Sequence, residues 1–325
     1  MTLLSYGEAI LSAFEYLLEK YPQCFVIGQG LWSPWYVGNT MTGLEKKFGQ
    51  SRIIDTPVSE AACTGAAIGA SLAGAMPIMV HPRMDFMLYA MDPIVNQAAK
   101  WSYMFGGASH PGVTIRAIVN RGGEQGAQHS QALHSWFAHV PGLRVVMPAS
   151  VQDARDLLIA SVICPDPVIY IDDRWLYDYT DDVSPIQELS LSNVIPACIS
   201  QGDDITIVAI GHSVKLATQS VDLLKNHNIS PDIFDVRVLT PFNCEGIVNS
   251  VKRTSKLVVI DGAWSTCGFA SEVITSVVEN LHPSAFSAPP MRITLPNVPA
   301  PTASNLEDCY YLSVDTIISR ILSFF

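Results

Sequence analysis

Short runs of apolar, largely β-branched residues alternate with helix-length segments along most of this chain, and this alternation is its most constraining feature. The runs are continuously apolar, which is typical of strands buried on both faces of a parallel sheet. Strands that alternate with helices predict an α/β fold. The predicted strands are CFVIGQG (24–30), RIIDTP (52–57), MPIMVH (76–81), GVTIRAIV (112–119), RVVMPA (144–149), PVIYID (167–172), ITIVAIG (205–211), DIFDVRVL (232–239), KLVVIDG (256–262) and MRITLP (291–296).

An acidic, proline-interrupted stretch around residues 173–200 separates the strands into two sets. A length of 325 residues agrees with about two domains, at roughly 150 residues per domain. We predict a first domain over residues 1–185, a connector over 186–200 and a second domain over 201–325. Helices are predicted over 59–74, 85–104 and 313–325, and SYGE (5–8) should form a capping box that opens the first helix.

The composition limits the classes of partner that this chain can have. Charged residues make up only 15% of it, against about 25% in ordinary domains, so the chain should either bury unusual amounts of surface in partners or be poorly soluble alone. A net charge of -11 argues against nucleic acid, and no run of 18 apolar residues is free of charges and breakers, which argues against a membrane span. Seven scattered cysteines without a C-x-x-C predict a reducing, cytoplasmic location and no metal site.

One candidate site lies where the strand at 52–57 gives way to a helix. Glu60 stands in the first turn of that helix, and small residues follow it on several faces, which predicts a helix buried between other elements. Two interpretations of Glu60 remain open. Generic statistics favour an acid that complements the positive end of the helix. The other interpretation is a carboxylate held in a cleft, where burial raises its proton affinity.

A second candidate site is the glycine-rich loop RGGEQGAQHSQ (121–131), which follows the strand at 112–119. Loops at the carboxyl ends of parallel strands are where open sheets bind ligands. His129 ends the loop, and His134 and His139 follow on a predicted helix. Because the three histidines are spaced by five residues, they do not share one helical face as ligands at i and i+4 would. A lone histidine is more often structural than functional, and only the position of His129 after the loop favours a role for it.

The residues around these two sites resemble the β subunits of thiamine-diphosphate-dependent 2-oxo acid dehydrogenases, in particular the E1 β subunits of pyruvate and acetoin dehydrogenases. The resemblance covers nearly the whole chain. It implies a transketolase-like pyrimidine-binding domain, then a transketolase C-terminal-like α/β domain. It also implies an α2β2 heterotetramer with active sites between α and β subunits. The matching segments are TPVSEAACTGAAIGASLAG, DPIVNQAAKWSYMFGG, GAQHSQALHSWFAHVPGLRVVMPAS, DPVIYID, VRVLTPF and DGAWSTCGFASEV.

The resemblance implies roles for four residues. Glu60 matches the carboxylate that bonds N1′ of the aminopyrimidine and so assists loss of the C2 proton of thiamine diphosphate. Val58 and Phe86 match positions that touch the cofactor, and His129 matches the histidine that faces the substrate. The family binds the diphosphate and its Mg²⁺ through a Gly-Asp-Gly and a later Asn-Asn, neither of which occurs here. An α subunit would have to supply them.

The sequence departs from the family pattern at two places. The family reads G-E-D after its first strand, where this chain has Gly28, Gln29 and Gly30, so two acids are lost. The family reads Q-F-A-D-[YF], where this chain has PRMDF (82–86), which places Arg83 beside the pyrimidine. We expect Arg83 either to meet an anionic group of the substrate or to stack on the cofactor or an aromatic ring. Asp85 is expected to cap the next helix.

Three functions are therefore weighed. The first is an E1 β subunit that decarboxylates or cleaves a 2-oxo substrate and passes the acyl group on, with a lipoyl-domain E2 protein as a further partner. The second is a subunit of a split transketolase-like carboligase, which would have no such E2 partner. The third is a catalytically decayed interaction subunit, against which the joint retention of Glu60 and His129 argues.

Overall fold

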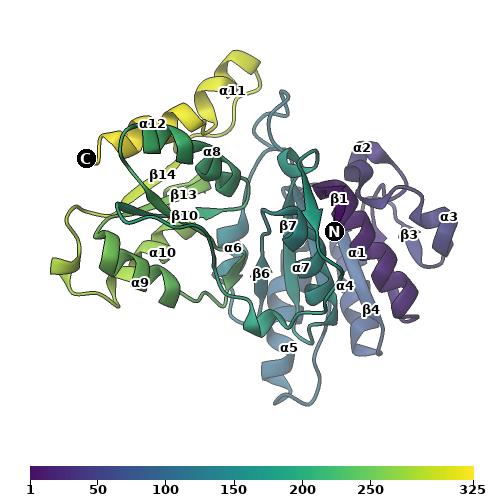
Figure 1. The fold of residues 1–325 in the computed structure, drawn as a ribbon. Coiled ribbons are helices and arrows are strands. Elements are labelled where there is room, and N and C mark those ends of the chain that lie inside the picture. The colour runs from purple at the N-terminus through teal and green to yellow at the C-terminus, as the bar shows by residue number, and fades with distance from the viewer. The chain divides into compact units, whose positions relative to one another are not determined.

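The computed structural model describes residues 1–325, which form two compact units (Figure 1). The first unit comprises Met1–Arg121 and Gln128–Val194, and the second comprises Gly122–Ala127 and Ile195–Phe325. The glycine-rich loop is thus divided, because most of it belongs to the second unit while His129 belongs to the first. None of the helices combines the length and the hydropathy that a membrane crossing requires.

The first unit is built on a parallel sheet with the strand order β6-β7-β5-β4-β2-β3. Every residue of β5 and β7 is buried, as are five of the six in β4, which confirms the prediction of strands covered on both faces. The strands are β2 (Cys24–Gly28), β3 (Ile53–Asp55), β4 (Met76–His81), β5 (Thr114–Val119), β6 (Arg144–Val146) and β7 (Val168–Asp173).

A separate antiparallel pair joins the chain start to the acidic stretch that follows β7. β1 (Thr2–Ser5) pairs with β8 (Thr180–Val183), so the acidic stretch around 173–200 contains a strand of the first unit. The predicted capping box is confirmed, since Ser5 accepts a hydrogen bond from the Glu8 N–H and the Glu8 side chain accepts one from the Ser5 N–H. The remaining helices of this unit are α1 (Tyr6–Lys20), α2 (Pro34–Val37), α3 (Leu44–Phe48), α4 (Glu60–Leu72), α5 (Ala99–Met104), α6 (His134–Ala138) and α7 (Val151–Ile163).

Two predictions about helices of the first unit need correction. The segment predicted as a helix over 85–104 is helical from Phe86 to Met104 but is not a regular α-helix, which is the first correction. It runs through a 3₁₀ helix at Phe86–Ala90, a π-helical segment at Pro93–Ala98 and α5, because Pro93 has no N–H to continue a regular helix. The helix α4 is not buried within the chain, since much of its small-residue face is exposed. Its exposed residues are Ala61, Ala62, Gly65, Ala66 and Gly69.

The second unit is built on a sheet with the order β14-β13-β10-β11-β9, in which only β9 is antiparallel to its neighbour. The predicted strand 232–239 is broken after Asp235, because Arg237 takes a left-handed backbone conformation with φ 59°. The elements are β9 (Ala197–Ser200), β10 (Ile205–Ile210), α8 (His212–Asn226), β11 (Pro231–Asp235), β12 (Val238–Thr240), α9 (Glu245–Thr254), β13 (Leu257–Trp264), α10 (Phe269–Val278), β14 (Met291–Leu295), α11 (Ser304–Tyr310) and α12 (Val314–Leu322).

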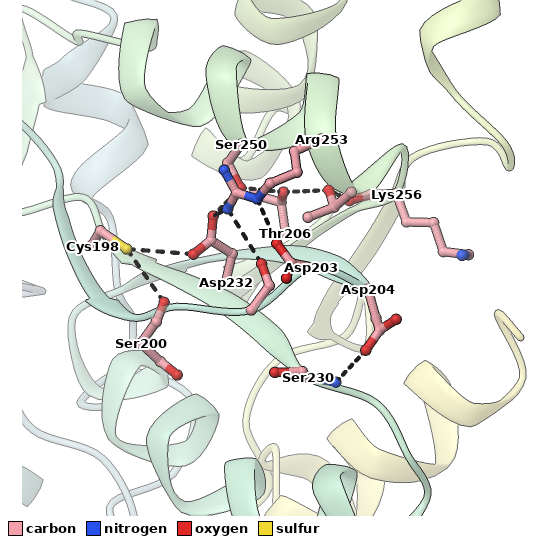
Figure 2. Close-up of polar contacts among 12 residues, drawn as sticks. Cys198, Ser200, Asp203, Asp204, Thr206, Ser230, Asp232, Ser250, Arg253 and Lys256 are labelled. Atoms are coloured by element: carbon pink, nitrogen blue, oxygen red, sulfur yellow. Dashed lines mark hydrogen bonds and ion pairs between the residues drawn. The ribbon is translucent and has the colours of Figure 1, made fainter.

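A polar cluster at the amino end of this second sheet pairs its charges internally (Figure 2). The buried Asp232 accepts hydrogen bonds from Ser250 and from the Arg253 guanidinium, and the Cys198 Sγ lies 3.5 Å from its Oδ1. The Thr206 hydroxyl lies 2.6 Å from that of Ser250. A cavity of about 470 Å³ opens beside these groups, but they are already bonded to one another, so the cluster stabilises the sheet.

Candidate active site

A small cavity lies at the carboxyl ends of strands in the first unit, the edge at which parallel sheets bind ligands. It encloses about 20 Å³, room for roughly one water molecule. Its walls come from four places in the chain: the residues that follow β2, those that follow β3, the first turn of α4, and the end of β4 with the loop after it. The lining residues are Gln29, Thr56, Pro57, Ser59, Glu60, Cys63, Met79, Val80, His81, Pro82, Arg83 and Phe86.

Glu60 is the first residue of α4 and is half-buried in this cavity. Its carboxylate makes no hydrogen bond and no ion pair within the chain. The helix places it there because β3 ends at Asp55 and the backbone turns through the segment at 56–59 before the first helical residue. An acid at this position complements the helix dipole, and its unpaired oxygens can also accept a proton or a hydrogen bond from a ligand in the cavity.

The structure brings His129 next to the same site. Its ring meets the Phe86 ring edge-on, with ring centroids 5.3 Å apart and an interplanar angle of 88°. Glu60, Arg83 and Phe86 line one cavity, and His129 borders it through Phe86. Val58, in contrast, is 66% exposed and is not among the lining residues, so within this chain it lies outside the cavity.

The other two histidines differ from His129 in burial. His134 is 1% exposed at the start of α6, whereas His139 is exposed at the end of that helix. The glycine-rich loop before them is partly bonded within its own unit, since the Glu124 N–H donates to both carboxylate oxygens of Glu307, at 3.1 and 3.0 Å. This N–H is therefore satisfied by a protein carboxylate, which limits the loop as a ligand site.

Arg83, like Glu60, is a charged residue of the cavity that forms no ion pair. Its guanidinium donates through both terminal nitrogens to the side-chain oxygen of the buried Asn120, when that amide turns its oxygen toward Arg83, and Nη2 lies 3.3 Å from it. No carboxylate forms an ion pair with Arg83, whereas the buried Arg116 pairs with Asp172 at 2.7 Å. Burial, and then the nearby cation of Arg174, lower the pKa of the Arg83 guanidinium.

Asp85 does not cap the following helix, so that expectation is wrong. Its Oδ1 instead accepts two hydrogen bonds from Gln131, one from the backbone N–H at 3.2 Å and one from Nε2 at 2.9 Å. Its Oδ2 is buried and has no partner. Burial raises the pKa of the Asp85 carboxyl, and the hydrogen bonds from Gln131 and the nearby His129 oppose that change.

Two features of the site were not anticipated from the sequence. His81 ends β4, lines the cavity and is fully buried, with its Nε2 3.2 Å from the Thr64 Oγ1; burial lowers its pKa to about 3, so it is neutral at pH 7. Gly30 is required by geometry, because its φ is 69° and a Cβ there would lie 2.4 Å from the Tyr36 ring. The acid that the family places at Gly30 therefore has no room in this chain.

Metal ligands are not grouped in this chain, since no three His, Cys, Asp or Glu side chains are placed together so that they could hold an ion. The cavity of Glu60 offers one unpaired carboxylate and the aromatic ring of Phe86. The unpaired carboxylate suits the ring nitrogen of a heterocycle at the mouth of the cavity, because the cavity itself is too small for a ring, and the site has no grouped ligands for the cation of a diphosphate.

Two family profiles cover most of the chain. Residues 3–178 match the profile described as "Transketolase, pyrimidine binding domain", and residues 197–317 match "Transketolase, C-terminal domain". A solved structure titled "Split gene transketolase, inactive beta4 tetramer" has the same fold, with a TM-score of 0.79 over 98% of this chain and 97% of that one, at 20% sequence identity.

Curated relatives match over a similar length. The "Pyruvate dehydrogenase E1 component subunit beta-2, mitochondrial" of Oryza sativa is 35% identical over 96% of this chain and 83% of its own. The corresponding β subunit of Saccharomyces cerevisiae is 32% identical over 97% of this chain and 87% of its own. The "Acetoin:2,6-dichlorophenolindophenol oxidoreductase subunit beta" of Bacillus subtilis is 35% identical over 86% of this chain and 81% of its own.

Proposed function

The chain belongs to the family of E1 β subunits of thiamine-diphosphate-dependent 2-oxo acid dehydrogenases, and from this premise we propose that it provides the pyrimidine half of a cofactor site that an α subunit completes. The observation that carries the proposal is the unpaired Glu60 carboxylate in a cavity shared with Phe86. Thiamine diphosphate, when bound, supplies the carbon nucleophile and the electron sink for 2-oxo acid decarboxylation. Magnesium and the diphosphate would be held mainly by the α subunit, since this chain lacks the motif for them.

Each residue of the candidate site would then have a separate role in binding or chemistry. Glu60 would accept the hydrogen bond of the pyrimidine N1′, and Phe86, with Val58 from the rim, would pack against the ring. His129 would hold the substrate carboxylate or move a proton at the reacting carbonyl oxygen. The neutral His81 and the apolar walls at Met79 and Val80 would keep water away from the Glu60 carboxylate.

Large exposed apolar side chains support the proposed α2β2 assembly. They include Trp35 at 74%, Tyr89 at 73% and Tyr103 at 91% exposure, and together with the bare face of α4 they form more apolar surface than an isolated subunit needs. The low content of charged residues agrees with burial of this surface against partner subunits. All seven cysteines are free.

We expect the isolated chain to bind no thiamine diphosphate and Mg²⁺ that calorimetry can detect. Co-expression with a Gly-Asp-Gly-bearing α chain should give a heterotetramer that binds both, because only then is the diphosphate half present. Micromolar binding by the isolated chain would contradict the proposal. A heterotetramer that assembles but binds no cofactor would identify the chain as a decayed interaction subunit.

Arg83, which forms no ion pair, supports a proposal about the substrate. A half-buried guanidinium that has only an amide partner and a second cation nearby is stabilised by an anion. Its planar fork matches a carboxylate or a phosphate. We therefore propose that the 2-oxo substrate carries a second anionic group, which binds Arg83. A lipoyl-domain E2 protein would receive the acyl group in this scheme, and a carboligase would need none.

Changing Arg83→Phe should reverse the preference of the assembled complex between a dianionic 2-oxo acid and pyruvate. A hydrogen bond to a charged group contributes roughly 1.5–3 kcal/mol, so kcat/KM for the dianionic substrate should fall about 10- to 150-fold. Arg83→Lys is the matched control, since it keeps the charge and loses the planar fork. Its kcat/KM for the dianionic substrate should lie between those of the wild type and Arg83→Phe. Identical substrate rankings in wild type and Arg83→Phe would exclude Arg83 as a substrate ligand.

A further inference from the structure

One buried oxygen near the site has no partner within the chain. Asp85 immediately precedes Phe86 and is 6% exposed, so both carboxylate oxygens are shielded from water. Oδ1 is fully used by Gln131, whereas Oδ2 is buried and unpaired. Buried acceptors are nearly always hydrogen-bonded, and an exception at the edge of an active site calls for a functional explanation.

His129 is the nearby group that could satisfy this oxygen. Its ring packs edge-on against Phe86, the residue next to Asp85, and the His129 imidazole interacts electrostatically with the Asp85 carboxylate. Neither ring nitrogen of His129 makes a hydrogen bond within the chain. Asp85 also fixes Gln131, two residues beyond His129, at both its backbone and its side chain. The carboxylate thus anchors the segment that carries the histidine.

The other ionisable groups around this carboxylate do not offer it a hydrogen bond. Arg83, from the same loop, interacts with Asp85 through charge alone, and its guanidinium donates to Asn120. Glu60, from α4, is an acid that lines the same cavity as Phe86. His81, from the end of β4, is bonded to Thr64. Of these ionisable groups, His129 is the one that has unbonded ring nitrogens and packs against the residue next to Asp85, and it is therefore the donor that we assign to the unpaired oxygen.

We propose that Asp85 is a positioning residue, whose Oδ2 accepts a hydrogen bond from one ring nitrogen of His129 in the assembled enzyme. A neutral imidazole has one donor and one acceptor nitrogen, so this bond fixes the tautomer and turns the other nitrogen toward the substrate. Partners of this kind orient catalytic histidines in many enzymes. The inference rests on the proposed function of His129 and adds the residue through which it is oriented.

Asp85→Asn is the most direct test, because asparagine keeps the Oδ1 acceptor for Gln131 and replaces Oδ2 with a donor. In the heterotetramer we expect kcat to fall roughly 10- to 100-fold, the range reported for such orienting partners, with little change in KM. The acid limb of the kcat/KM profile should move to lower pH, because removing a negative charge favours the neutral imidazole. Gln131→Ala, which keeps the carboxylate, is the matched control and should leave that limb in place.

A second readout is independent of turnover. Carbethoxylation of His129 by diethylpyrocarbonate, followed by peptide mass spectrometry at several pH values, reports the free ring nitrogen directly. In Asp85→Asn the pH dependence of carbethoxylation should move to lower pH, as the acid limb of the kcat/KM profile does. Unchanged kcat, rate profile and carbethoxylation in Asp85→Asn would overturn the proposal.

A double-mutant cycle separates this proposal from the function on which it rests. If Asp85 acts through His129, Asp85→Asn should have almost no effect in a His129→Ala background. Additive losses would overturn the positioning role, and full activity of His129→Ala would instead overturn the proposed function of His129. If Asp85→Asn fails to assemble, Asp85→Glu keeps the charge and should lower kcat by misplacing the carboxylate while the acid limb stays in place; an unchanged kcat would overturn the proposal.

Discussion

Replacing Glu60 with glutamine should slow exchange of the C2 proton of bound thiamine diphosphate roughly 10²–10⁴-fold, the usual contribution of a positioned acid–base group. The substitution preserves shape but removes the carboxylate, which has no other partner in its cavity. The measurement is deuterium exchange in the heterotetramer, quenched in acid and followed by NMR. Because Glu60 is only half-buried and unbonded, the melting temperature of the complex should change little.

Glu245→Gln is a matched control for this experiment. Glu245 is the first residue of α9, just as Glu60 is the first residue of α4, and it is exposed. If the acids only complement their helix dipoles, each substitution should cost roughly 0.3–1 kcal/mol of stability and neither should affect exchange. A selective loss of exchange in Glu60→Gln would reject the helix-dipole interpretation of Glu60, whereas equal behaviour of the two variants would support it.

Changing His129→Ala should lower kcat/KM for the 2-oxo substrate roughly 10²–10⁴-fold, because the variant loses the group that moves a proton at the substrate. Binding of thiamine diphosphate by calorimetry should be retained, since no cavity-lining residue is changed. His139→Ala is the appropriate control, because His139 is exposed on the same segment, whereas the buried His134 would confound folding with chemistry. Equal losses in His129→Ala and His139→Ala would show that the wrong histidine was chosen.

The parallel strands could be predicted because burial on both faces leaves a continuous Val and Ile signature, as in β5 and β7. The position of Glu60 at the junction of β3 and α4 followed from the same pattern. The break after β11 could not be predicted, since the left-handed conformation of Arg237 is rare for a residue other than glycine. The change of helix type within 85–104 coincides with Pro93, which lacks the backbone N–H that a regular helix needs.

The contacts of Asp85 and His81 are beyond local sequence patterns. Asp85 bonds a residue 46 positions later, and the neutral state of His81 depends on complete burial behind α4. The prediction that α4 is buried was wrong for a different reason. A helix of small residues does indicate close packing, but the partner surface that would cover it is not part of this chain, so burial could not be assigned to the subunit alone.

The exposed face of α4 should affect the abundance of this subunit in the cell. A subunit that presents alanine, glycine and aromatic side chains to water resembles a partly unfolded protein to chaperones and proteases, which act on exposed apolar surface. Copies made in excess of the partner should be degraded, and the abundance of this chain should follow the synthesis rate of the partner rather than its own.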